Sequence, residues 1–189
     1  MSGETLPERW GGLPIALHWL NALIIAALIV IGWRMVHGGM DAAATFDAYQ
    51  LHKSLGFLAL ALTVARLATR MSFASPPQPL APRWERRLAS FTQGALIVLT
   101  IGASLAGWLV VSASLLPIPT RVFNLFVIPN IARPDAALFG WATLAHEVAA
   151  WTIAGLVALH AAGALKHHFV DRDDVLKRML PAVRQKGRG

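Results

Sequence analysis

The sequence predicts an all-α integral membrane protein, a four-helix bundle, and its composition and hydropathy pattern support that prediction. Hydrophobic residues make up 56% of the 189-residue chain and charged residues only 14%, against about 25% charged residues in a typical soluble domain. Four apolar stretches reach or approach the roughly 20 residues that span a bilayer. These stretches are Leu13–Trp33, Ser54–Met71, Gly94–Ser112 and Leu144–Leu165. We therefore treat residues 1–189 as a single membrane domain, with 171–189 as a charged tail.

The segments around these stretches were assigned from their residue types. Leu13–Trp33 is expected to be a retained helix, because no small-residue cleavage site of a signal peptide follows it. The first connection, Gly38–Tyr49, is expected to be a short loop. Ser75–Arg87 contains four prolines before a basic cluster and is expected to be a non-helical connection. Ala113–Gly140 keeps many apolar residues and is expected to lie in the membrane interface, because in water it would expose an apolar patch.

The distribution of positive charge predicts the membrane topology. The net charge is +7, and 13 of the 17 Lys and Arg residues fall on the side that holds both chain ends. By the positive-inside rule, both termini are expected in the cytoplasm of a bacterial inner (plasma) membrane protein. The basic residues do not cluster with aromatic residues along one face, so nucleic acid is not an expected partner.

The absence of cysteine limits the possible metal chemistry. With no cysteine in the chain, disulfides, thiolate metal sites, iron–sulfur clusters and covalent c-type haem are excluded. A bound metal must therefore use histidine, carboxylate or methionine ligands.

Four histidines at membrane depth form the main functional pattern. His146 and His160 are 14 residues apart in the last stretch, so they share a helix face and differ in depth by about 21 Å. His18 lies near the cytoplasmic start of the first stretch, and His52 lies at the periplasmic start of the second. We therefore expect His18 to meet His160 and His52 to meet His146.

Each expected pair is suited to clamp a planar porphyrin, because its two imidazoles come from different helices and fill both axial positions of an iron. A histidine within a membrane is costly unless it is paired, hydrated or bound to a metal. Zinc or copper is an alternative metal for these sites, although two imidazoles without a further ligand suit haem better than a tetrahedral metal. His37 is expected to be an ordinary interfacial residue.

Small and basic residues near the pairs are candidates for cofactor contacts. Gly56 comes one turn after His52 and leaves room for a porphyrin ring. Four further glycines in the third and fourth stretches leave similar room, although all five equally permit close helix packing. The four are Gly102, Gly107, Gly155 and Gly163. Arg66 follows His52 by 14 residues and is expected to pair with haem propionates near His18 and His160, or to snorkel at a helix end. Lys53 is expected to pair with haem propionates on the periplasmic side, or to be an ordinary flanking lysine.

His167 is a candidate quinone contact. It follows His160 by seven residues and so lies on the same face about 10 Å nearer the cytoplasm. A protonatable group there suits a quinone, because quinone reduction takes up protons together with electrons. The alternative is a solvated or headgroup-facing residue, which is also the expectation for His168. Glu147 is expected to contact a ligand or water, or to be an ordinary acidic residue in a first turn.

The chain resembles the bacterial cytochrome b561 family, which is related to the cytochrome b subunits of nickel–iron hydrogenases. The resemblance runs from about Leu13 to Pro181, and four pieces carry it in this order. They are His18-Trp19, His52 with Gly56, His146-Glu147, and Leu159-His160 through Lys166-His167-His168-Phe169 to Arg178-Met179-Leu180-Pro181. It implies two non-covalent b-type haems and electron transfer between a quinone, either ubiquinone or menaquinone, and a periplasmic donor or acceptor, either superoxide or a protein.

Three classes of function follow from this pattern. The first is a di-haem electron carrier, with an enzymatic variant that oxidises superoxide and reduces ubiquinone. The second is a cytochrome b anchor subunit that passes on the electrons of a larger dehydrogenase or hydrogenase. The third is a histidine-using transporter, which would need broken helices or several intramembrane carboxylates that the sequence lacks.

Overall fold

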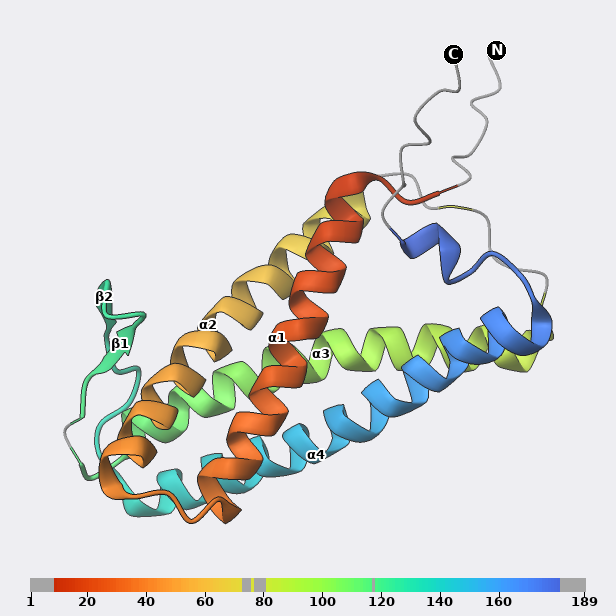
Figure 1. The fold of residues 1–189 in the computed structure, drawn as a ribbon. Coiled ribbons are helices and arrows are strands. Elements are labelled where there is room, and N and C mark those ends of the chain that lie inside the picture. Colours follow the sequence, from red (N-terminus) through yellow and green to blue (C-terminus); the bar gives the residue numbers. More distant parts are fainter. Residues whose placement is uncertain (1–8, 73–75, 77–80, 117, 181–189) are drawn as a thin grey trace.

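Four long helices form the molecule, as the sequence predicts (Figure 1). The computed structural model describes residues 9–72, 76, 81–116 and 118–180. The helices are α1 (Gly12–His37), α2 (Ala42–Ser72), α3 (Arg83–Ala113) and α4 (Ala136–Lys166). Each is long and apolar enough to cross a membrane. A two-stranded hairpin, β1 (Thr120–Val122) with β2 (Phe126–Ile128), lies between α3 and α4 in the chain.

Three helices begin earlier than their apolar stretches, because local capping signals start them. The carboxylate of Asp41 accepts a hydrogen bond from the amide of Ala44, and the carboxylate of Asp135 accepts one from Leu138, each at 2.8 Å. Pro82 stands at the N-cap of α3, where its fixed φ and missing amide hydrogen cost nothing. The expectation that Gly38–Tyr49 forms a loop is therefore wrong from Ala42 onward.

The expected non-helical connection Ser75–Arg87 is also wrong at its end, since Arg83–Arg87 form the first turns of α3. Two of its four prolines, Pro77 and Pro79, lie outside the described residues. The basic cluster therefore projects from a helix. The loop prediction for this cluster rested only on its position beside the proline segment.

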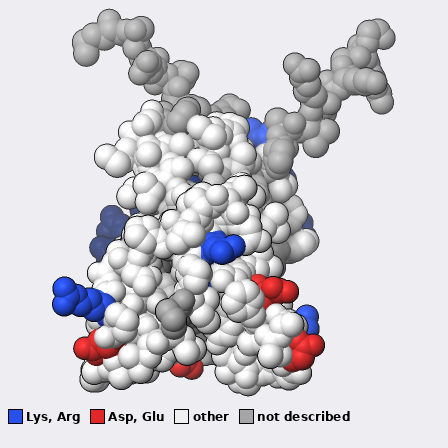
Figure 2. Space-filling view, turned by 90° about the vertical axis from the view of Figure 1, so that its left-hand side faces the viewer, with Lys and Arg blue, Asp and Glu red and all other residues white. Residues whose placement is uncertain are grey.

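The buried core is small and partly polar, which suits a bundle whose apolar side chains face lipid. Asn21 on α1 and Thr63 on α2 are almost fully buried, and the Asn21 amide donates to the Thr63 hydroxyl at 3.0 Å. Large apolar side chains such as Leu23 and Val98 point outward. Figure 2, which faces the hairpin side, shows a broad uncharged surface with charged side chains gathered mostly toward the bottom of that view.

Side-chain hydrogen bonds hold the segment between α3 and α4 against the helices at two places. In the middle of the segment, the Ser54 hydroxyl on α2 accepts a hydrogen bond from the amide of Phe123 at 2.9 Å. Nearer α4, Trp108 of α3 donates its indole N–H to the carbonyl of Pro129 at 3.0 Å, and Ser112 accepts from the amide of Ile131 at 3.1 Å. This segment contains the β-hairpin, which the sequence analysis did not predict.

The chain ends meet on one side of the bundle. Helix α4 continues into a π-helical turn, His167–Asp171, and a 3₁₀ turn follows at Lys177–Met179. The guanidinium of Arg9 donates to the carbonyls of Lys177 and Leu180, and the indole of Trp19 donates to the carbonyl of Met179 at 2.6 Å. An even number of crossings likewise returns the chain to the side on which it began.

Candidate functional site

Two histidine pairs join helices inside the bundle. The rings of His18 on α1 and His160 on α4 have centroids 6.2 Å apart at an interplanar angle of 68°. The rings of His52 on α2 and His146 on α4 have centroids 6.0 Å apart at 78°. All four side chains are partly buried. Because α4 supplies one member of each pair, the two sites lie about 21 Å apart along that helix.

The spacing within each pair matches shared coordination of one metal ion. Two imidazoles that bind one iron from opposite sides, through nitrogen–metal bonds of about 2 Å, hold their ring centroids roughly 6 Å apart. Edge-to-face packing also allows this spacing, so what favours ligation is its repetition in two histidine pairs at two levels of one helix. The donor set also fits haem b, because each site offers two imidazoles and the chain has no cysteine for covalent attachment.

The surroundings of His146 orient its ring. The Nδ1 atom of His146 lies 2.8 Å from the carbonyl oxygen of Ala103 on α3. A carbonyl only accepts, so Nδ1 carries the proton and Nε2 keeps its lone pair for a metal. Gly107, one turn along α3, lies against the same ring, and a Cβ atom there would approach His146 to 3.2 Å.

His52 is held in a comparable way by α1. A Cβ atom at Gly32 would meet Cε1 of His52 at 3.3 Å, so the ring packs directly on the α1 backbone. Its Nδ1 atom is buried and has no hydrogen-bond partner among the described residues. All four helices therefore contribute to this site, two with histidines and two with glycines.

Arg66 lies at the other pair. Its guanidinium Nη2 is 3.1 Å from Nδ1 of His18, and because arginine only donates, Nδ1 of His18 accepts in this arrangement. Coordination of a metal through Nε2 of His18 would instead put a proton on Nδ1. Arg66 cannot keep this contact when His18 serves as such a ligand.

The remaining basic and glycine candidates have less specific surroundings. The Lys53 ammonium lies 3.5 Å from the carbonyl of Pro119, and so contacts the segment between α3 and α4. Gly56 has open space where a Cβ would stand, as do Gly102, Gly155 and Gly163. The carbonyl of Gly56 accepts a hydrogen bond from Ser104 on α3 at 3.3 Å, which ties α2 to α3 at this level.

His167 belongs to an ion-pair network at the end of α4. Its Nδ1 atom is 2.7 Å from a carboxylate oxygen of Asp173 and 3.2 Å from one of Asp171. Lys166 bridges Asp171 and Glu85 of α3 at 2.9 and 2.8 Å. Glu85, Asp171 and His167 lie close enough to hold a cation together, but the Lys166 ammonium already supplies the positive charge between the two carboxylates.

Three other residues are placed by the structure. His37 ends α1, stacks on Trp33 and bonds to its carbonyl at 3.1 Å, as an interfacial residue does. Glu147 is exposed. His168 is partly exposed, with its Nδ1 atom buried and its ring packed edge-on against Phe169, so the expectation of a solvated or headgroup-facing residue stays a prediction.

The sequence analysis missed several contacts of these sites. Gly32 contacts a histidine that lies 20 positions away in the chain, and a glycine in an apolar helix gives no signal of that contact. Ala103 acts through its backbone carbonyl, which side-chain identity cannot reveal. The acidic residues of Asp171–Asp174, shortly after His167, stand in the sequence as a signal of a carboxylate contact, and Asp173 lies nearest to the imidazole.

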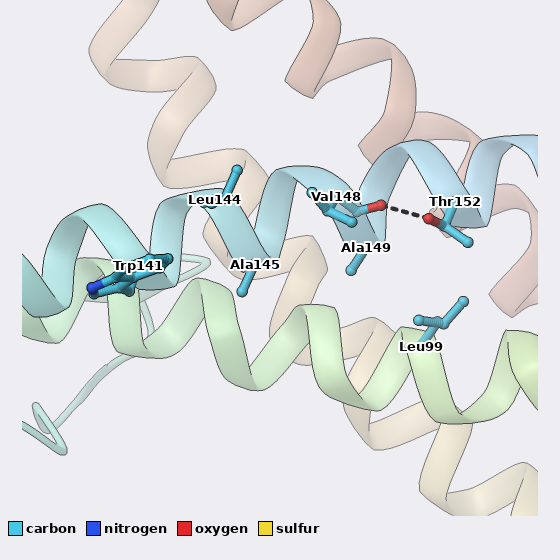
Figure 3. Close-up of a pocket in the computed structure, with 7 residues that line it drawn as sticks. All are labelled: Leu99, Trp141, Leu144, Ala145, Val148, Ala149 and Thr152. Carbon is cyan, nitrogen blue, oxygen red and sulfur yellow. Dashed lines mark hydrogen bonds between the residues drawn. The ribbon is translucent and has the colours of Figure 1, made fainter.

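A shallow apolar groove between α3 and α4 has no histidine in its lining (Figure 3). Its lining comprises Leu99, Trp141, Leu144, Ala145, Val148, Ala149 and Thr152. The hydroxyl of Thr152 donates to the carbonyl of Val148 in its own helix at 2.7 Å. The lining offers no titratable or metal-binding group, so the groove is not the redox site.

Four membrane-crossing helices with paired histidines define the class of membrane cytochromes b. A family model for prokaryotic cytochrome b561 matches residues 9–182, and the chain belongs to this family. It is therefore a multi-pass bacterial membrane protein of electron transport that carries haem b.

Named relatives cover nearly the full chain. Cytochrome b561 homolog 2 of Escherichia coli strain K12 is 36% identical over 183 residues, which are 95% of each chain. Cytochrome b561 homolog 1 of the same strain is 26% identical over 92% of this chain and 98% of its own. The probable superoxide oxidase CybB of Yersinia pestis is 24% identical over 94% of this chain and 98% of its own.

Proposed function

We propose that the chain holds two haems b, one between His18 and His160 and one between His52 and His146, and transfers electrons between them. The observation that carries this proposal is the repeated spacing of about 6 Å between the paired rings, at two levels of α4. A bound haem supplies a one-electron couple at its iron, which the protein places and tunes. In this arrangement one haem serves each membrane surface.

The two sites differ in the charge that surrounds them. At the His18–His160 site, Arg66, whose guanidinium lies 3.1 Å from Nδ1 of His18, would supply a positive charge that can pair with the propionates of a bound haem. At the His52–His146 site, the carbonyl of Ala103 and the backbone at Gly32 and Gly107 hold the rings. A nearby positive charge favours the reduced state of an iron, so electrons move more favourably toward the Arg66 site.

Quinone binds, in our proposal, beside the His18–His160 site at His167. The Asp173 carboxylate only accepts, so it fixes a proton on Nδ1 of His167 and leaves Nε2 to accept the proton of a quinol hydroxyl; in the imidazolium form, Nε2 instead donates to a quinone oxygen. The amide of Val175 donates to the second oxygen of Asp173 at 3.0 Å, which holds the carboxylate in place. Asp173 is thus a positioning residue, and His167 is the group that exchanges protons with the quinone.

The side of the membrane follows from charge. Thirteen of the 17 Lys and Arg residues lie on the side of Arg9 and the tail, which supports cytoplasmic termini. His167 and the quinone then face the cytoplasm, and the His52–His146 site faces the periplasm.

Superoxide is our candidate for the periplasmic donor. A relative of matching length carries the name probable superoxide oxidase, and Lys53, Arg121 and Arg133 supply positive charge that attracts an anion on this side. Two superoxide anions would give up one electron each and leave as dioxygen. One quinone would take those two electrons and two protons and leave as quinol.

Substitution of single histidines tests the pairing. His18→Ala and His160→Ala should each remove one haem and the same haem, because each leaves its iron with a single axial ligand. His52→Ala and His146→Ala should remove the other haem. Pyridine haemochrome analysis and reduced-minus-oxidised spectra of the purified variants measure this, with His37→Ala as the matched control that keeps both. A loss that groups His18 with His52 would contradict the proposed pairs.

Asp173→Asn tests the positioning of His167. The amide can present an N–H to Nδ1, so the proton of a neutral imidazole moves to Nε2, which then cannot accept from a quinol hydroxyl, and quinol oxidation should slow about 10-fold or more. Both haems should remain. Asp174→Asn is the control, because Asp174 is exposed and pairs with Lys177, which lowers the pKa of its carboxyl. Stopped-flow reduction of the haems by ubiquinol measures the rate, and equal rates in both variants would refute the role of Asp173.

Superoxide added to the purified protein tests the outer partner. Rapid haem reduction is expected, and it should slow in Arg121→Gln if charge steers the anion. Absence of reduction in the native protein, together with haem that ubiquinol still reduces, would remove superoxide and leave the electron carrier. Co-purification with dehydrogenase subunits would instead favour the anchor role.

A further inference from the structure

The β-hairpin carries exposed apolar side chains that no helix covers. Leu125 at its tip is 79% exposed, and Phe126 and Val127 on β2 are 55% and 56% exposed. Further exposed apolar residues flank the hairpin in the chain, namely Leu115, Leu116, Ile118 and Ile131. In water such a surface is costly, so the hairpin requires an apolar environment on its outer side.

The hairpin attaches to α2 where the apolar part of that helix begins. Ser54, the first residue of the apolar stretch Ser54–Met71, accepts from the amide of Phe123 at 2.9 Å and lies 3.2 Å from the carbonyl of Arg121. Helix α2 starts 12 residues earlier, at Ala42, and so extends about 18 Å beyond this point. The hairpin is therefore attached to the side of α2 where the apolar stretch of that helix begins, and not beyond the end of the helix.

The two faces of β1 have different roles. Thr120 and Val122 are buried, whereas Arg121 between them is exposed. Between Ala113 and Ala136, the chain contains just three charged residues, Arg121, Arg133 and Asp135. Several large apolar side chains with sparse, mainly positive charge are typical of segments that lie at the headgroup boundary of a bilayer.

The turn of the hairpin is held in a costly conformation. Phe123 and Asn124 have φ values of 47° and 59°, and a bulky residue such as phenylalanine rarely adopts this left-handed region because its Cβ crowds the backbone. Two hydrogen bonds retain it, one from the Phe123 amide to Ser54 and one from the Leu125 amide to the carbonyl of Val122, each 2.9 Å long. The result is a fixed tip that directs Leu125 outward.

We propose that Thr120–Ile128 is a membrane-interface anchor, which inserts the side chains of Leu125, Phe126 and Val127 among phospholipids at the headgroup–acyl boundary. Lipid is the occupant because the apolar surface of the hairpin adjoins the lipid-facing surface of α2, to which it is bonded. The broad uncharged surface on this side of the molecule agrees with that (Figure 2). The anchor also fixes the chain beside Ser54, two residues from His52.

A spin label at Leu125 tests the anchor in the haem-loaded protein. The chain has no cysteine, so Leu125→Cys gives a single labelling site. Two matched variants bracket the result: Leu23→Cys, an outward residue within the apolar stretch of α1, and Asp47→Cys, an exposed residue on the protruding part of α2. An unchanged haem spectrum shows that each labelled protein is folded.

The measurement is collision of the label with oxygen and with a water-soluble nickel chelate, in vesicles of phosphatidylcholine and phosphatidylglycerol. The anchor predicts an oxygen-to-nickel ratio at Leu125→Cys well above that of Asp47→Cys and below or equal to that of Leu23→Cys. A ratio equal to that of Asp47→Cys would overturn the proposal. So would spin–spin broadening that disappears on dilution with unlabelled protein, because a second copy would then cover the hairpin.

Discussion

The arrangement of the whole molecule depends on one helix, α4, which presents histidines to two different partners. A spacing of 14 residues keeps His146 and His160 on one face while separating them by about 21 Å in depth. Helices α1 and α2 run in opposite directions, so each brings its own histidine to a different level. The 6.2 and 6.0 Å ring separations are the consequence of this antiparallel arrangement. An intramembrane histidine has few ways to satisfy its polar atoms, and a shared metal satisfies two rings at once.

The two histidine pairs have different chemical surroundings, charged side chains at one and backbone groups at the other. At the His18–His160 end, a guanidinium, a lysine and several carboxylates surround the site and the helix that follows it. At the His52–His146 end, the contacts come from backbone: a carbonyl at Ala103 and close approaches at Gly32 and Gly107. In the proposed di-haem arrangement, charge near one iron and neutral dipoles near the other would give the two sites unequal potentials. That inequality would give electron flow between them a direction.

Apolar periodicity and histidine spacing carried most of what could be predicted from the sequence. The four helices, the family and the relation of His160 to His18 and of His146 to His52 all depend on patterns within single helices, which the chain displays directly. The true starts of α2, α3 and α4 depend on Asp41, Pro82 and Asp135, whose capping role a hydropathy window overlooks. The hairpin was missed because its turn, Phe123-Asn124, has no glycine. It forms through the tertiary bond to Ser54. Gly32 was missed because it contributes only the space that its missing side chain leaves for His52. Ala103 was missed because it contributes its main-chain carbonyl.

The number of haems per chain tests this account most directly. Purified protein, expressed with an ample supply of haem, should give two haems b per polypeptide when pyridine haemochrome is set against protein concentration from amino-acid analysis. Both should be low-spin in the oxidised protein, as an iron with two imidazole ligands is. A value of one haem per chain, or a second haem that is high-spin, would contradict the claim that both histidine pairs hold iron.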